Sequence, residues 1–234
     1  YFKKDMTTVS MLDDLYLPDG KKLTSMVVGR PGSGKSFYIK NTLKEFSKQN
    51  KDENLRIVYI CPKQEMDLGE KTLTDAYSLD KHLQKNRIGV IYPNIDYIDS
   101  EVDYVIDTLF EIQQSNPKFK AVLVIDDAQI FITSRKSSSV ALRRLALTGR
   151  SKGIRFVGVS HSVIFSKDLE GSTSLILNFT MPVKMFHRDF NMRYGFDPEP
   201  YIQDLAENEY SYVYFDVTTG QSKLMPPLEV KGSK

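Results

Sequence analysis

The sequence predicts an α/β protein in which a mostly parallel central sheet is flanked by helices. Short apolar runs alternate along the chain with segments whose apolar residues recur at helical spacing. One run, residues 121–125, is apolar throughout, which is typical of a parallel strand buried on both faces. The chain has 234 residues, 41% of them hydrophobic, so it is long enough for one domain with a full core.

The expected strands begin with Met26–Val28, which leads directly into a glycine-rich loop. Pro62 and Pro93 end the second and third strands, since proline cannot continue a central strand. Residues 175–186 alternate loosely and are expected to form a further strand pair or extended segment. Residues 210–217 and 222–224 flank the turn 218–221 and predict a C-terminal β-hairpin. The remaining expected strands are 56–61, 88–92, 121–125 and 154–159.

Helices are expected where apolar residues fall three and four positions apart, at 36–46, 102–113 and 140–147. Residues 1–22 are polar, contain a turn signal at 18–20, and are interpreted as an N-terminal extension. Residues 23–186 then form the core. Residues 187–234 form a C-terminal segment that carries the hairpin and belongs to the same domain.

The composition excludes little by itself. The net charge is +2, so the overall charge neither indicates nor rules out a nucleic-acid partner. Cys61 is the single cysteine, so no internal disulfide is possible, and its apolar neighbours predict a buried strand thiol. No apolar run approaches ~18 residues and no signal-peptide pattern opens the chain, so we expect no membrane span.

A phosphate-binding loop follows the first expected strand and opens the first expected helix. In such a loop, glycines let the backbone N–H groups approach phosphate oxygens, and the helix N-terminus faces the anion. Lys35 is expected to reach the β- and γ-phosphates and Ser36 to bind Mg²⁺, which makes ATP and Mg²⁺ the expected cofactors. The expected nucleotide-binding residues are Gly29, Arg30, Pro31, Gly32, Ser33, Gly34, Lys35, Ser36 and Phe37.

Two carboxylates, Asp126 and Asp127, stand directly after the apolar run 121–125. Hydrolysis of a nucleoside triphosphate requires a metal ligand and a group that orients the attacking water at the end of a neighbouring strand. We therefore expect Asp126 to hold Mg²⁺ and Asp127 to polarise the water, the Walker B pattern. A guanine-specificity motif of the type Asn-Lys-x-Asp is absent from the sequence, which disfavours the GTPases.

The stretch 145–161 combines a helix ending at Gly149 and Arg150, a short basic turn, and an apolar strand ending in polar residues. With the close spacing of the two motifs, it resembles the FtsK–HerA superfamily, and in particular its compact viral genome-packaging ATPases of the poxvirus type. The resemblance covers about residues 24–165. It implies a RecA-like P-loop fold of the additional-strand (ASCE) class, with the strand ending at Ser160 between the P-loop strand and the Walker B strand.

The resemblance also implies roles for individual residues. Ser160 or His161 would lie near the γ-phosphate as a sensor. Arg150 would reach the ATP of a neighbouring subunit as a trans arginine finger, with Arg143 and Arg144 as rival candidates. The alternative for Arg150 is a charge that offsets the dipole at a helix C-terminus. The chain departs from the family at two positions, since Asp127 replaces a usual glutamate and the sensor is usually an amide.

A translocase needs basic side chains facing its polymer. The candidates for DNA contact are Lys118, Lys120, Arg135 and Lys136, with Lys63 as a further loop lysine. For each of them, an ordinary surface cation is the alternative interpretation.

The leading hypothesis is an ATP-hydrolysing DNA translocase that packages a viral double-stranded DNA genome into a preformed capsid. It would act as a homo-oligomeric ring in the cytoplasm of an infected cell, in contact with a capsid or portal protein. The alternatives are a monomeric P-loop phosphotransferase and a ring ATPase of the same superfamily that serves DNA transfer or secretion.

Overall fold

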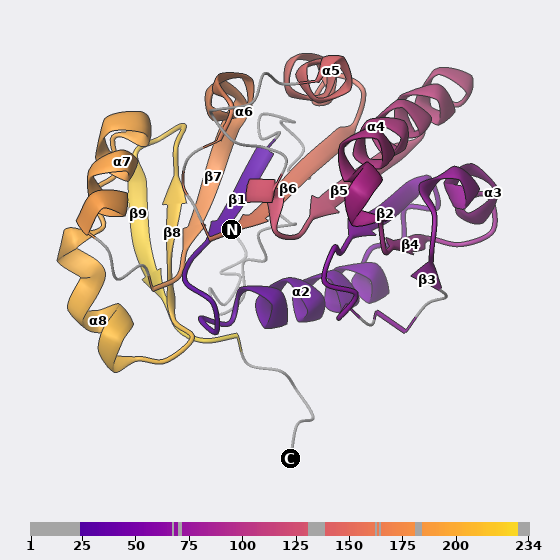
Figure 1. Ribbon diagram of the computed structural model, residues 1–234. Coiled ribbons are helices and arrows are strands. Elements are labelled where there is room, and N and C mark those ends of the chain that lie inside the picture. The colour runs from indigo at the N-terminus through magenta and orange to yellow at the C-terminus, as the bar shows by residue number, and fades with distance from the viewer. Residues whose placement is uncertain are drawn as a thin grey trace, which may run out of the picture.

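A computed structural model describes residues 24–66, 68–69, 72–130, 139–161, 163, 165–180 and 184–228. Within these ranges nine strands form one sheet in the order β3-β4-β2-β5-β6-β1-β7-β8-β9 (Figure 1). The strands are β1 (Thr24–Val28), β2 (Leu55–Ile60), β3 (Thr72–Leu73), β4 (Ile88–Ile91), β5 (Lys120–Ile125), β6 (Ile154–Ser160), β7 (Thr173–Asn178), β8 (Tyr212–Asp216) and β9 (Gln221–Met225). The first seven strands in this order run parallel, and β8 and β9 are antiparallel.

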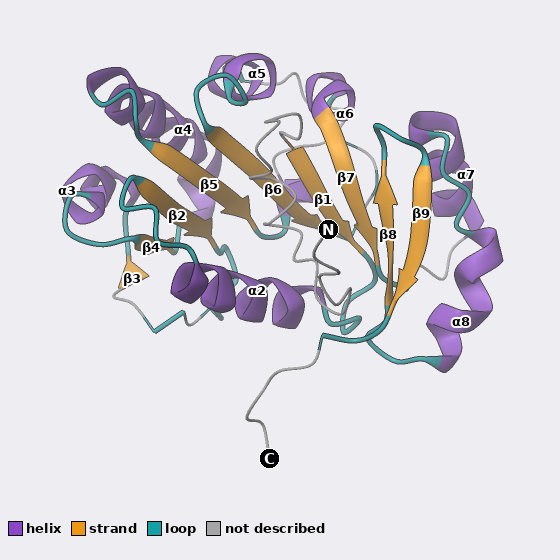
Figure 2. Cartoon of the chain, turned by 180° about the vertical axis from the view of Figure 1, so that it is seen from behind, coloured by secondary structure: helices purple, strands orange, loops and turns teal. Residues whose placement is uncertain are grey.

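Helices cover both faces of this sheet. The α-helices are α2 (Lys35–Gln49), α3 (Leu79–Leu83), α4 (Ile98–Ser115), α5 (Val140–Thr148), α6 (Lys167–Ser172), α7 (Lys184–Tyr194) and α8 (Ile202–Glu207). Short 3₁₀ helices lie at Ala76–Ser78, Ile95–Tyr97, Ala128–Ile130 and Glu199–Tyr201. Helix α2 packs on one face, whereas α4, α5 and α6 lie on the other (Figures 1 and 2).

The side chains of β1 show how the sheet separates two cores. Val27 packs toward α2, in a cluster with Ile39 and Leu43. Met26 and Val28 point to the opposite face, where they join the cluster that contains residues of α4 and α5. Because successive side chains of a strand alternate between faces, an all-apolar run is what a strand covered on both sides requires.

The structure confirms the predicted fold class. Each strand predicted from an apolar run is present within a residue or two of its expected bounds. The three predicted helices are also present, but α2 ends three residues later than expected and α4 begins four residues earlier. Strand β6 lies between β1 and β5, as the resemblance implied. The C-terminal hairpin is present as β8 and β9, which extend the same sheet beyond β7.

The prediction of a strand pair or extended segment over residues 175–186 is wrong at its end. Strand β7 ends at Asn178, and α7 begins at Lys184, so residues 184–186 are helical. Phe190 and Tyr194 are four residues apart in α7 and both are buried, which gives the segment a helical rather than an alternating pattern. The short elements β3, α3, α6 and α8 were not predicted, because two to six residues carry too little periodicity.

The expected N-terminal extension, residues 1–22, lies outside the described residues. Among the helices that are described, none combines the length and the apolar character needed to cross a membrane.

Candidate active site

The predicted phosphate-binding loop connects β1 to α2 at the carboxyl end of β1. Gly29 and Gly34 have φ angles of 158° and 93°, and both are crowded. A Cβ on Gly29 would lie 2.7 Å from the Cβ of Phe179, and a Cβ on Gly34 would lie 2.9 Å from a ring carbon of Tyr210. Only glycine fits these two positions, because of both the backbone conformation and the close neighbours.

Backbone hydrogen bonds fix the loop between the ends of the two strands that flank β1. The N–H of Gly29 donates to the carbonyl of Ser160 at the end of β6 (3.3 Å), and the N–H of Arg30 donates to the carbonyl of Thr180 just beyond β7 (2.9 Å). Residues that follow β6 and β7 therefore lie on opposite sides of the loop.

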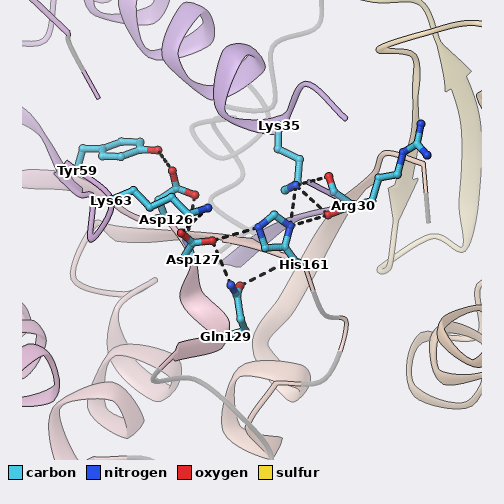
Figure 3. Close-up of polar contacts among 9 residues, drawn as sticks. Arg30, Lys35, Tyr59, Lys63, Asp126, Asp127, Gln129 and His161 are labelled. Atoms are coloured by element: carbon cyan, nitrogen blue, oxygen red, sulfur yellow. Dashed lines mark hydrogen bonds and ion pairs between the residues drawn. The ribbon is translucent and has the colours of Figure 1, made fainter. Parts of the chain in front are cut away.

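Lys35, in the first turn of α2, is folded back onto its own loop (Figure 3). Its Nζ donates to the carbonyls of Gly29 (2.8 Å) and Arg30 (2.9 Å) and lies 3.1 Å from Nδ1 of His161. The side chain is only 5% exposed, and this burial lowers its pKa to about 8. The shift means that burial disfavours the charged form of Lys35 by about 3 kcal/mol relative to water. An anion beside Nζ would therefore stabilise the ammonium.

Asp126 follows the last residue of β5 and is buried. It accepts hydrogen bonds from the Tyr59 hydroxyl at Oδ2 (2.9 Å) and from the N–H of Asp127 at Oδ1 (3.0 Å). Burial raises the pKa of Asp126, and these hydrogen bonds oppose that rise. The carboxylate is thus held in one orientation while each oxygen keeps a lone pair for a further ligand.

Asp127 adopts a left-handed backbone conformation with φ 49°, unusual for a residue other than glycine but tolerated best by Asp and Asn. Its Oδ2 lies 2.8 Å from Nζ of Lys63, and its Oδ1 lies 3.2 Å from Nε2 of His161 and 3.1 Å from the Gln129 amide. Burial alone would raise the pKa of Asp127, but the hydrogen bonds from Lys63 and Gln129 outweigh it and lower the pKa.

His161 connects the lysine to the carboxylate, and one tautomer satisfies both contacts. Nε2 must carry a proton to donate to Asp127, and Nδ1 must then accept from Lys35. In this tautomer the 3.0 Å approach of Nδ1 to the Gly29 carbonyl is not a hydrogen bond, because both atoms are acceptors. The backbone N–H of His161 also donates to Oε1 of Gln129 (3.2 Å). Lys35, His161 and Asp127 thus form one continuous chain of polar contacts (Figure 3).

Not every predicted residue takes part in this cluster. Ser160 is buried at the end of β6, and its carbonyl holds the loop, whereas the side chain of His161 reaches Lys35 and Asp127. Arg30 is exposed, and its side chain points away from the cluster (Figure 3). Ser36 and Phe37 are exposed in the first turn of α2, while Ser33 is buried with no hydrogen-bond partner for its Oγ among the described residues.

Sequence reasoning missed three members of the cluster: Tyr59, Lys63 and Gln129. Lys63 had been grouped with the DNA-contacting candidates, but here it pairs with Asp127. The available signal was the sheet order, since β2 pairs with β5 and aligns Ile60 with Ile125. The residues that follow β2 consequently lie beside the carboxylates that follow β5.

The remaining cationic candidates lie away from the cluster. Lys118 and Lys120 lie at the amino end of β5, whereas the phosphate loop lies at the carboxyl end of β1. Lys120 also pairs with Asp52 (2.7 Å). Arg150 is exposed in the turn that precedes β6, and so it also lies near the amino ends of the strands. Arg135 and Lys136 lie outside the described residues.

The two rival finger candidates in α5 are paired within the chain. Arg143 lies 3.4 Å from Asp168, and Arg144 pairs with Asp107 while stacking over the ring of Phe110. Both arginines therefore behave as parts of the helix surface in this structure.

The sheet order and the loop together are those of the RecA-like P-loop fold, and comparison with solved structures agrees. The genome-packaging NTPase B204 of Sulfolobus turreted icosahedral virus 2, in complex with AMPPCP, is similar with a TM-score of 0.72 and 16% identity over 88% of this chain and 98% of that one. VirB4 of Thermoanaerobacter pseudethanolicus has a TM-score of 0.63 and 11% identity over 89% of this chain and 90% of that one.

The N-terminal domain of zonular occludens toxin from Neisseria meningitidis is also similar, with a TM-score of 0.50 and 13% identity over 89% of this chain and 96% of that one. These neighbours are FtsK–HerA-type P-loop ATPases, which agrees with the resemblance seen in the sequence. No protein-family model and no curated protein sequence matches the chain. At these identities, the likeness shows the shared fold.

Proposed function

We propose that this chain is an ATPase that drives a viral double-stranded DNA genome into a preformed capsid, working as a homo-oligomeric ring. The observation that carries the proposal is the likeness to a viral genome-packaging NTPase along nearly the whole of both chains. The proposed partners are the DNA, further copies of the chain and a capsid or portal protein. The proposed setting is the cytoplasm of an infected cell.

The loop residues would bind the triphosphate of ATP through the backbone N–H groups at the start of α2. Lys35 would exchange the carbonyls of Gly29 and Arg30 for phosphate oxygens, which offer a negative charge to its buried ammonium. The unpartnered Oγ of Ser33 lies in the same loop and is a further hydroxyl suited to this anion.

The residues present also fit a magnesium ion. Mg²⁺ in nucleotide sites takes one or two protein oxygens, with phosphates and waters completing the shell. The Ser36 hydroxyl and the Asp126 carboxylate, which Tyr59 orients, would supply those oxygens. When bound, the ion neutralises charge on the phosphates.

Asp127 would hold the attacking water in line with the γ-phosphate. In this structure His161 and Gln129 both contact Oδ1, whereas Lys63 alone contacts Oδ2, so Oδ2 keeps a lone pair at which the water would bind. A γ-phosphate would attract the ammonium of Lys63, which is half-exposed and has room to move. His161 would report the same event, because it contacts both Lys35 and Asp127.

In the proposed ring, cationic residues outside the polar cluster would take further roles. Arg150 would act as a finger at the ATP of the neighbouring subunit, where it stabilises charge in the transition state. Lys118, Lys120, Arg135 and Lys136 would contact the DNA phosphates.

The test is the rate of ATP hydrolysis by the full chain with and without double-stranded DNA. We expect DNA to raise the rate and added salt to remove the increase, because phosphate contacts weaken steeply with ionic strength. Lys35→Ala should show no hydrolysis under either condition, which controls for contaminating ATPases. ATP hydrolysis that is the same with and without DNA would contradict the packaging role and favour one of the two alternatives.

A further inference from the structure

The turn after β2 places Lys63 in the polar cluster. The N–H of Gln64 donates to the carbonyl of Cys61 (3.1 Å), which closes a four-residue turn with Pro62 in its second position. Proline favours this position, because its ring fixes the φ angle that the turn requires. Lys63 occupies the third position, and its Nζ lies 2.8 Å from Oδ2 of Asp127 (Figure 3). The turn therefore holds a cation at the end of the neighbouring strand β5.

Two residues beside this ion pair have strained backbones. Gln64 has φ 58° and Asp127 has φ 49°, both in the left-handed region that residues other than glycine adopt rarely. Such conformations persist only where the surrounding structure enforces them, and they cluster at active sites. The backbone is therefore constrained at both ends of the ion pair, next to Lys63 and at Asp127 itself.

Lys63 brings a second ammonium group to the site of Lys35. Burial is the main cause of the lowered pKa of Lys35, and the nearby charge of Lys63 adds to it. Two like charges at close range repel each other, and an anion between them relieves the repulsion. The side chain of Lys63 is 52% exposed, so its ammonium can turn towards a bound triphosphate without displacing the buried Lys35.

Asp127 does not depend on Lys63 alone for its orientation. Nε2 of His161 and the amide of Gln129 both contact Oδ1, at 3.2 Å and 3.1 Å. The carboxylate therefore stays in place when the lysine turns to a phosphate. A water held at Oδ2 and a γ-phosphate oxygen held by Lys63 would then lie beside each other, which is the arrangement that attack on the phosphorus requires.

We propose that Lys63 is a catalytic residue whose ammonium contacts a γ-phosphate oxygen of the ATP bound in the same subunit. The inference rests on the proposed ATPase function, because it assigns a role in the same hydrolysis. In that step the water oxygen bonds to the γ-phosphorus, the bond to the β,γ-bridging oxygen breaks with its electron pair left on ADP, and the water proton passes to Asp127. A cation held beside the γ-phosphate oxygens stabilises the transition state. Lys63 would act in cis, whereas Arg150 would act from the neighbouring subunit.

Calorimetry with MgADP and a non-hydrolysable MgATP analogue separates contact with the γ-phosphate from support of the loop. Lys63→Met removes the charge and keeps the length of the side chain. It should bind the analogue about threefold to tenfold more weakly than the parent, because one charge-assisted contact is lost. It should bind MgADP with the parent affinity, which also shows that the variant is folded.

Two further variants control this measurement. Lys63→Arg restores the positive charge and should bind the analogue within about threefold of the parent. Lys85→Met removes an exposed lysine just after α3 and should bind both ligands like the parent.

Single-turnover hydrolysis tests the catalytic role. Lys63→Met should reduce the rate about 10²-fold, the scale of removing one group that stabilises transition-state charge, and Lys63→Arg should recover at least about tenfold of that loss. Mixing tests whether Lys63 acts in cis. A ring of Lys63→Met and Lys35→Ala subunits contains no site with both lysines, so the mixture should stay inactive.

Three results would overturn the proposal. Hydrolysis by Lys63→Met reduced by less than about tenfold would mean that the ammonium does not act in the reaction. An equal loss of affinity for MgADP and the analogue would mean that Lys63 supports the loop and not the γ-phosphate. Recovery of hydrolysis on mixing with Lys35→Ala would mean that Lys63 acts on the neighbouring subunit. A parent protein that hydrolyses no ATP would instead contradict the proposed function itself.

Discussion

The two sides of the phosphate loop differ in chemistry. On the β6 side, Lys35, Asp126, Asp127 and His161 are linked by hydrogen bonds and ion pairs, and they come from three separate parts of the chain. On the β7 side, an aromatic cavity of about 430 Å³ carries no charged side chain among the described residues that line it, which are Gly34, Phe37, Tyr38, Phe179, Tyr210, Pro227 and Leu228. Electrostatic groups act on charge that develops during a reaction, whereas stacking contributes equally before and during it.

The comparison separates two kinds of functional effect. Changes on the polar side should act mainly on turnover, because those groups would face the γ-phosphate. Changes on the aromatic side should act on nucleotide affinity and leave turnover of the bound nucleotide nearly unchanged.

The largest effect is expected for Lys35→Ala. The variant removes the one buried cation of the loop, so it should lose measurable ATP hydrolysis and most nucleotide affinity. Turnover and binding are to be measured on the same preparation. Lys48→Ala, in the exposed last turn of the same helix, is the control and should behave like the parent. Parent-like hydrolysis by Lys35→Ala would remove the assignment of the phosphate loop.

Arg150→Ala tests whether a neighbouring subunit must supply an arginine to the polar side for ATP hydrolysis. As a trans finger, Arg150 should not affect ATP binding to an isolated subunit, and its loss should reduce turnover in the assembled ring by ~10³. Mixing this variant with Lys35→Ala creates some interfaces where both halves are sound, so hydrolysis should reappear from two inactive proteins. Full activity of Arg150→Ala under assembly conditions would end the finger role and direct the test to Arg143 and Arg144.

A smaller effect is expected for pH. The pKa of Lys35 is lowered to about 8, so the side chain is cationic below this pH and loses its charge as the pH rises above it. A phosphate favours the charged form, so the dissociation constant for MgATP should stay flat from pH 6.5 to 7.5 and rise ~tenfold by pH 9. Calorimetry in buffers of different ionisation enthalpy should also detect proton uptake on binding at pH 8.5.

Lys35→Arg provides the control for this pH dependence. Arginine remains charged throughout this range, so its affinity for MgATP, whatever its absolute value, should not change between pH 7 and pH 9. If MgATP affinity of the parent protein were also unchanged between pH 7 and pH 9, the lowered pKa of Lys35 would be contradicted.

The sequence was informative where function depends on adjacent residues. The loop 29–36 and the pair Asp126 and Asp127 are local patterns attached to predictable strands, and both lie at the carboxyl edge of the sheet. The helix at 184–194 was not predicted, and the extended segment expected over 175–186 ran into its first three residues. The short elements gave too little periodicity to detect.

Contacts between distant segments were harder to predict. Lys63 reaches Asp127 only because β2 pairs with β5, and Tyr59 reaches Asp126 for the same reason. The aromatic cavity combines residues 34–38 with 179, 210, 227 and 228, which only the antiparallel return of β8 and β9 brings together. No spacing along the sequence encodes that arrangement.

The most direct test of this account is to measure MgATP affinity and single-turnover hydrolysis for Asp127→Asn. Asparagine tolerates the left-handed conformation at this position, so the substitution changes the charge with little effect on the fold. We expect near-parent affinity with hydrolysis reduced by ~10³ or more, while Asp126→Asn should also weaken Mg²⁺ binding and so raise the Mg²⁺ concentration that hydrolysis requires. Parent-like hydrolysis by Asp127→Asn, with ATP bound normally, would contradict the claim that the polar side of the loop carries the chemistry.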